Sequence, residues 1–91
     1  MAETCVIKIK NLKGLHARAT AAFVKTAEQF ESQISVEKDG EIPVSGKSIM
    51  GLLMLAVPIG EEIKITAEGT DEKEAIKALC DLIDNRFGEE I

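Results

Sequence analysis

The hydrophobic pattern of this chain changes period several times, and these changes restrict the fold more than any other feature. Residues 5–10 alternate between apolar and polar positions, which predicts a strand whose buried face holds Cys5, Ile7 and Ile9. From His16 to about Phe30 the apolar residues recur at helical spacing instead. The predicted buried stripe of this helix consists of Ala19, Ala22, Phe23, Thr26, Ala27 and Phe30.

The middle of the chain reads as a hairpin followed by a short helix. Residues 34–37 alternate again, and Asp39-Gly40 is a strong signal for a tight turn. Ile42 and Val44 continue the alternation on a return strand, which Pro43 should make an edge or an irregular strand because proline has no N–H to donate. Ser48 is a good N-cap for the apolar run behind it, residues 49–55, which predicts a short helix.

The last third of the chain contains one more strand and one more helix. Residues 62–67 alternate with Ile63, Ile65 and Ala67 inward. Asp71 and Glu74 resemble a capping box that opens a helix, and Gly88 is expected to end it. The buried side of this helix is predicted to hold Ala75, Ile76, Leu79, Cys80, Ile83 and Phe87.

The resulting order is β-α-β-β-α-β-α, which predicts an α+β domain of two layers. Its four strands should form an antiparallel sheet with the three helices packed on one face. The 91 residues are enough for one compact domain and too few for two, so residues 1–91 are expected to form a single domain.

Composition and charge exclude several classes of function. The net charge is −5 and aromatic residues make up only 3%, which opposes a nucleic-acid-binding module. No apolar run approaches the length of a membrane span, and residues 1–4 lack the pattern of a secretion signal, so we expect a cytoplasmic protein without membrane insertion. Cys5 and Cys80 are expected to be buried reduced thiols; with one histidine they do not make a zinc site, and no metal or cofactor is predicted.

The chain has a single histidine, His16, at the point where a loop becomes the first helix. Unpaired N–H groups and the helix dipole favour an anion there and disfavour a cationic ring, so the neutral, nucleophilic form of His16 is favoured near pH 7. Arg18 supplies a guanidinium suited to phosphate oxygens, and Gly14 permits close backbone approach. These parts describe a phosphoryl acceptor, with no second acid or base nearby in sequence.

Two separated motifs resemble the signatures of the HPr family of bacterial sugar phosphotransferase systems. Residues 14–18 (GLHAR) are similar to its active-site signature, and residues 47–53 (KSIMGLL) to the segment around its regulatory serine. Residues 60–65 and Glu68-Gly69 are similar to a third family segment, so the resemblance covers nearly the whole chain. It implies the family's open-faced β-sandwich.

The resemblance also implies a function. His16 would be phosphorylated on Nδ1 by enzyme I, which draws on phosphoenolpyruvate, and would pass the phosphoryl group to an EIIA unit, with Arg18 helping to hold that group. The protein would be a phosphocarrier rather than an independent enzyme. The exposed apolar docking surface of the family corresponds here to Ala17, Ala21, Ile49, Met50, Leu53 and Met54.

Ser48 corresponds to the serine that a bifunctional HPr kinase/phosphorylase modifies in some bacteria. Its other role, as N-cap of the short helix, is compatible with this one. A phosphate there would add about two negative charges beside the docking surface without disrupting the fold.

The sequence departs from the family pattern at three places. Ala19 stands where proline is usual, the hairpin of residues 39–47 is one residue longer than in many members, and Leu53 and Met54 make the docking helix unusually apolar. The longer hairpin is shared with nitrogen-related paralogues, so a regulatory carrier that moves no sugar is the alternative. A small enzyme such as a phosphatase would need a catalytic set beyond one His and one Arg.

Overall fold

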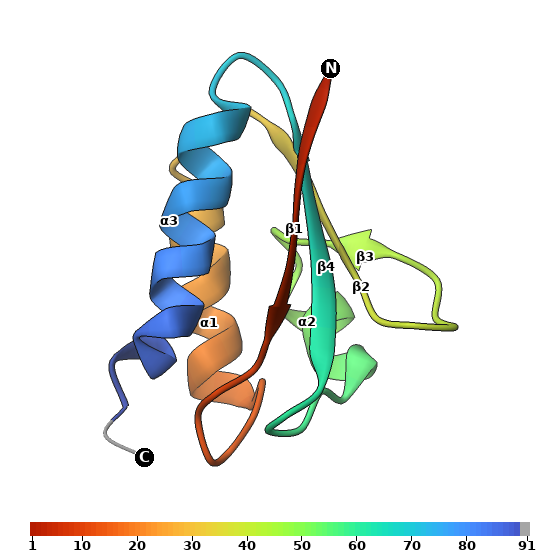
Figure 1. The fold of residues 1–91 in the computed structure, drawn as a ribbon, viewed down its shortest axis with the longest axis vertical. Coiled ribbons are helices and arrows are strands. Elements are labelled where there is room, and N and C mark those ends of the chain that lie inside the picture. The colour runs from red at the N-terminus through yellow and green to blue at the C-terminus, as the bar shows by residue number, and fades with distance from the viewer. Residues whose placement is uncertain (90–91) are drawn as a thin grey trace.

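Four strands form one antiparallel sheet in the order β1-β4-β2-β3 (Figure 1). The structure is a computed structural model and describes residues 1–89; Glu90 and Ile91 of the predicted domain lie outside the described residues. The strands are β1 (Ala2–Lys8), β2 (Gln33–Glu37), β3 (Val44–Ser45) and β4 (Glu62–Glu68). The first strand in sequence therefore pairs with the last.

The helices are α1 (Ala17–Ala27), α2 (Ile49–Leu55) and α3 (Glu72–Asp84), followed by the 3-10 turn η1 (Arg86–Gly88). Figure 1 shows α1 and α3 side by side along the sheet. One core receives Phe23 from α1, Leu52 from α2 and Leu79 from α3, all completely buried. Side chains on the other face of β1 are exposed, as Val6 is by 62%. The predicted α+β sheet with three helices is confirmed, and none of the described helices is both long and apolar enough to cross a membrane.

Several element boundaries differ from the prediction. β1 begins at Ala2 and ends at Lys8, because its register with β4 extends to the pair Ala2–Glu68. The return strand is reduced to Val44–Ser45, and Ile42 is 85% exposed, because Pro43 interrupts the ladder. α1 ends at Ala27 rather than Phe30, whose N–H bonds instead to the carbonyl of Ala27 in a tighter turn.

The predicted capping box of the last helix is wrong. Asp71 is the N-cap of α3, but its carboxylate makes no hydrogen bond to the helix. It accepts instead from the backbone N–H groups of Glu31, at 2.8 Å, and Ser32, at 3.0 Å, and from the Ser32 hydroxyl. Asp71 thereby ties the start of α3 to the chain entering β2, a contact between residues about 40 positions apart.

We expect Asp71→Asn to lower the urea midpoint at pH 7, because the amide turns N–H groups toward donors. The hydrogen bond from the Ser32 hydroxyl, followed by that from the Glu31 N–H, lowers the pKa of Asp71 below 3.8. A carboxyl whose pKa is lowered by folding stabilises the folded state above its unfolded pKa and loses this effect as the pH falls through the folded pKa. The gap between wild type and variant should therefore close below about pH 3.8, in urea titrations at several pH values.

Asp39→Asn is the matched control, because Asn-Gly is as good a turn as Asp-Gly. Asp39 is exposed in the β2–β3 turn, so this variant should unfold like wild type. Equal midpoints for Asp71→Asn and Asp39→Asn at pH 7 would contradict the role assigned to Asp71.

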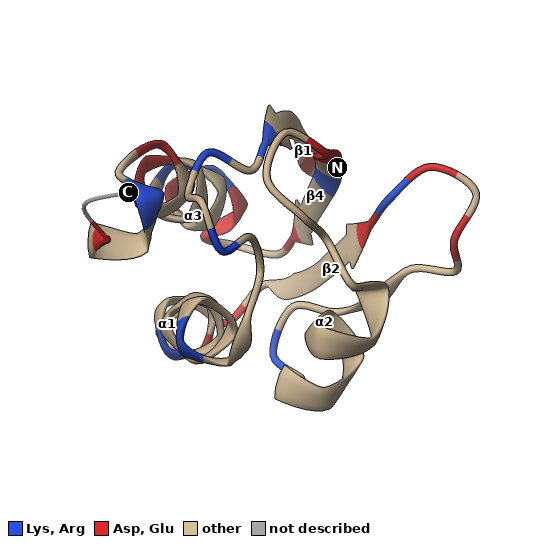
Figure 2. Ribbon diagram, turned by 90° about the horizontal axis from the view of Figure 1, so that it is seen from below, with Lys and Arg blue, Asp and Glu red and all other residues tan. Residues whose placement is uncertain are grey.

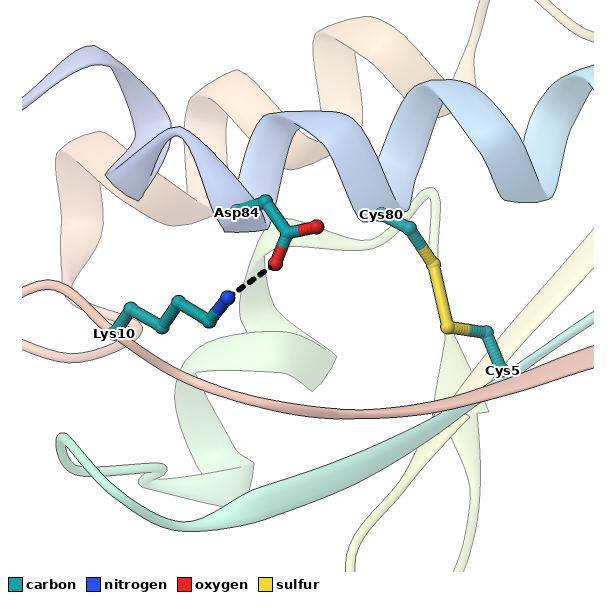
Figure 3. The surroundings of a disulfide bond; sticks show 4 residues. All are labelled: Cys5, Lys10, Cys80 and Asp84. Carbon is teal, nitrogen blue, oxygen red and sulfur yellow. Dashed lines mark hydrogen bonds and ion pairs between the residues drawn. A yellow bond between two sulfur atoms is a disulfide. The ribbon is translucent and has the colours of Figure 1, made fainter.

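Cys5 and Cys80 are joined by a disulfide, so the prediction of two reduced thiols is wrong (Figure 3). Cys5 points from β1 toward α3, and Cys80 points back from α3. The sequence pattern correctly placed both cysteines on inward faces. Their pairing depends on the docking of α3 against β1, which the sequence pattern does not predict. An exposed ion pair between Lys10 and Asp84 links the same two segments and contributes little by itself (Figure 3).

Candidate functional site

His16 is the N-cap of α1, with extended backbone angles (φ −85°, ψ −177°). Its carbonyl accepts the first helical hydrogen bond, from the N–H of Thr20 at 2.8 Å, but its side chain makes no capping bond. The imidazole is 26% exposed. His16 therefore lies at the helix start, as the sequence predicted, and its ring is accessible.

The loop before His16 is fixed by its backbone. Gly14 has a φ of +68°, and a Cβ there would lie 2.5 Å from the carbonyl oxygen of Val57. That oxygen accepts from the N–H of Leu15 at 2.9 Å, which anchors the loop to the segment after α2. The position requires glycine for both reasons, its left-handed φ and the close approach.

Glu89 brings a carboxylate to the histidine from the far end of the described chain. Its Oε2 lies 2.5 Å from Nε2 of His16, across a separation of 73 residues. Its Oε1 accepts from Nδ2 of Asn11 at 3.0 Å. No acid is close to His16 in sequence, as stated above, but folding brings Glu89 to the ring from a distant position that no local pattern marks.

The charge state of Glu89 follows from these contacts. Burial raises the pKa of Glu89, but the hydrogen bonds from His16 and Asn11, with the charges of His16 and Lys13, outweigh it and leave the pKa below its ordinary value. Glu89 is therefore an anion near neutral pH, and an ionised carboxylate only accepts hydrogen bonds.

The first turn of α1 carries no anion of its own. It contains no acidic residue, and the N–H groups that precede Thr20 have no partners within the helix. Arg18 lies in this turn with an exposed side chain that makes no hydrogen bond or ion pair within residues 1–89. This arrangement can accept an anion such as a phosphoryl group beside the imidazole. No cluster of three or more His, Cys, Asp or Glu suited to a metal ion occurs in the described part of the chain.

An apolar surface lies beside the histidine. α1 and α2 are in contact, and in Figure 2 α2 carries no charged residue along its length. Met50 and Met54 are 69% and 74% exposed, whereas Leu52 and Leu55 of the same helix are buried. All six residues predicted to form a docking surface are exposed: Ala17, Ala21, Ile49, Met50, Leu53 and Met54.

Ser48 caps α2, as predicted. Its Oγ accepts from the N–H of Gly51 at 3.0 Å, and the residue is half-buried. The hydroxyl lies directly before the exposed Ile49 and Met50.

Comparison with known proteins identifies the family. The family model PTS-HPr, described as "PTS HPr component phosphorylation site", matches residues 4–85. The chain belongs to the HPr family. The phosphocarrier protein HPr of Neisseria meningitidis serogroup A is 52% identical over 83 residues, covering 91% of this chain and 92% of that protein. The HPr-like protein Crh of Bacillus subtilis is 45% identical over 74 residues, covering 81% and 86%.

Solved HPr structures share the fold. HPr-C-His from Thermoanaerobacter tengcongensis superposes with a TM-score of 0.93 at 56% identity, covering 98% of this chain and 99% of that one. An HPr from Bacillus anthracis superposes with a TM-score of 0.85 at 40% identity, covering 90% of this chain and 96% of that one. The chain is therefore an HPr-family phosphocarrier in both sequence and fold.

Proposed function

We propose that this HPr-family protein accepts a phosphoryl group from phospho-enzyme I on His16 and transfers it to an EIIA-type acceptor. The observation that supports this most is the position of His16, whose accessible ring stands at the start of α1, a helix with no acidic residue in its first turn. The protein is then a substrate and intermediate of phosphotransfer rather than an independent enzyme.

The residues around His16 have separate roles in this proposal. The N-terminal turn of α1 and the guanidinium of Arg18 hold the phosphoryl oxygens. Both partners dock on the apolar surface of α1 and α2, where Met50 and Met54 offer adaptable contacts. The same surface serves enzyme I and EIIA in turn, because each must bring its own phosphoryl site to the same ring.

The direct test is incubation with phosphoenolpyruvate and enzyme I. We expect intact-mass analysis to show one added phosphoryl group, with an acid-labile phosphate that peptide mapping places on residue 16. Addition of an EIIA protein should then remove the label. A protein that gains no phosphoryl group from active enzyme I would contradict the proposal.

We assign the protein to the sugar phosphotransferase branch and to the cytoplasm, where phosphoenolpyruvate is available, with residues 1–91 acting as one carrier domain. The relatives described above are named phosphocarrier protein HPr and HPr-like protein Crh, and neither name favours the nitrogen-related alternative. The Cys5–Cys80 disulfide is unusual for a cytoplasmic protein, because thiol buffers there keep most cysteines reduced.

We further propose that Ser48 is a regulatory phosphorylation site for an HPr kinase/phosphorylase. Its half-buried hydroxyl adjoins Ile49 and Met50 of the docking surface. A charge at this point has to be desolvated when a partner covers the surface, which is costly unless a cation meets it.

We expect Ser48→Asp to raise the KM of enzyme I for this protein severalfold while the melting temperature changes little, because the N-terminus of α2 tolerates an anion. Steady-state phosphorylation and thermal unfolding measure the two effects. Thr70→Asp, in the exposed turn between β4 and α3, adds the same charge away from α2 and should leave KM unchanged. A normal KM for Ser48→Asp would leave Ser48 with only its capping role.

A further inference from the structure

The contact between Glu89 and His16 determines which ring nitrogen carries a proton. Oε2 of Glu89 lies 2.5 Å from Nε2 of His16, and an ionised carboxylate can only accept there. Nε2 must therefore hold the hydrogen. In the neutral form of the ring, the form that can act as a nucleophile, this is the one N–H, so the electron pair is left on Nδ1.

The structure around Glu89 keeps its carboxylate in place. Asn11 is completely buried, and its amide donates both to Glu89 and, at 2.7 Å, to the carbonyl of Gly14 in the loop that carries His16. The carboxylate is therefore bound to the histidine and to the loop that positions it. Its side chain is only 15% exposed.

The backbone before Glu89 is folded back in an unusual conformation. Arg86, Phe87 and Gly88 all have left-handed φ angles, of 53°, 56° and 80°. Residues with a Cβ rarely adopt this region, and such conformations persist where the surrounding structure holds them. Phe87 packs against the core and η1 contacts α1, which returns the chain from the end of α3 toward the histidine.

We propose that Glu89 is a positioning residue that holds the His16 ring by Nε2–H and leaves Nδ1 as the nucleophile. This inference rests on the proposed phosphocarrier function and extends it. The Nδ1 electron pair forms the bond to the phosphorus of phospho-enzyme I, and the bond from phosphorus to the donor breaks with its electrons staying on the donor. Nε2 keeps its proton, so the ring gains a positive charge next to the Glu89 carboxylate.

Two substitutions separate the hydrogen bond from the charge. Glu89→Ala removes both, and we expect kcat/KM for phosphorylation by enzyme I to fall by about tenfold, the lower end of the loss that follows removal of the partner that orients a metal-binding histidine. Glu89→Gln keeps one oxygen that can accept from Nε2–H, with its NH2 then facing Nδ2 of Asn11, and should lose less than Glu89→Ala but more than nothing. Glu28→Ala removes an exposed carboxylate at the other end of α1 and should retain the wild-type rate.

A spectroscopic measurement on the free protein tests the contact without any partner. In ¹⁵N-labelled wild type the Nε2–H proton of His16 should be visible and slow to exchange with water; in Glu89→Ala it should be lost. Glu28→Ala should keep it.

The outcomes distinguish this inference from the proposed function. Two results would overturn the role of Glu89 alone, provided that enzyme I phosphorylates the wild type. In the first, Glu89→Ala is phosphorylated at the wild-type rate. In the second, the wild type shows no protected ring proton. A wild type that enzyme I does not phosphorylate would overturn the proposed function, and the role of Glu89 with it. Loss of both the ring proton and the rate in Glu89→Ala, with partial rescue by Gln, supports the inference.

Discussion

Replacing His16 with alanine should abolish phosphorylation by enzyme I while the protein keeps its fold. His16 is the only histidine in the sequence, so no second imidazole can take its place. Its side chain makes no capping bond to α1, and a helix-start side chain contributes about 1 kcal/mol to stability. Intact-mass analysis after incubation with phosphoenolpyruvate, together with thermal unfolding, measures both expectations.

The interpretation depends on the variant being folded. A near-native melting temperature without phosphate identifies residue 16 as the acceptor. An acid-labile phosphate on folded His16→Ala would contradict the proposal, because His16 is the only residue that the proposal makes an acceptor of the phosphoryl group from enzyme I.

Gly14→Ala should destabilise the protein by about 3 kcal/mol and slow phosphorylation at His16. A left-handed φ costs an alanine about 1–2 kcal/mol, and overpacking costs a similar amount. Here the new methyl group would lie 2.5 Å from the carbonyl oxygen of Val57, which also accepts from the N–H of Leu15. Relief of the clash has to move the loop that carries His16. Urea unfolding and the phosphorylation rate report the two effects.

Gly40→Ala is the matched control for this prediction. Gly40 also has a left-handed φ, of +80°, but a Cβ there meets nothing within 4 Å. Gly40→Ala should therefore lower the free energy of unfolding by about 1 kcal/mol, from the left-handed φ alone, and leave phosphorylation unchanged. Equal losses of stability in the two variants would show that the approach to Val57 is unimportant.

The parts of the fold that could be predicted are those with a local cause. The alternation around Ile63 and Ile65 and the helical stripe around Phe23 identified buried faces, because burial repeats with the period of the backbone. The cap at Ser48 was readable because its partner, Gly51, lies three residues away. Pro43 predicted a weak strand because its own backbone lacks an N–H to donate, which is also a local cause.

The errors involve contacts between distant segments. Asp71 looks like part of a capping box, but it bonds to Ser32, about 40 residues earlier. Cys5 meets Cys80 because α3 docks on β1, which only the tertiary structure determines. The candidate site divides in the same way: His16 and Arg18 share a local motif, whereas Glu89 reaches the ring through a left-handed turn at Arg86 and Phe87 that the sequence does not indicate.

The strand order has a consequence for synthesis of the protein. β1 is an edge strand whose one neighbour is β4, with Ala2 paired to Glu68. A growing chain on the ribosome therefore carries its first strand without a hydrogen-bonding partner until residue 68 has emerged. Contacts of such long sequence separation form late, and an unpaired strand edge exposes a nascent chain to aggregation. The sheet, and the loop at Gly14 that presents the histidine, are completed only when most of the chain has been translated.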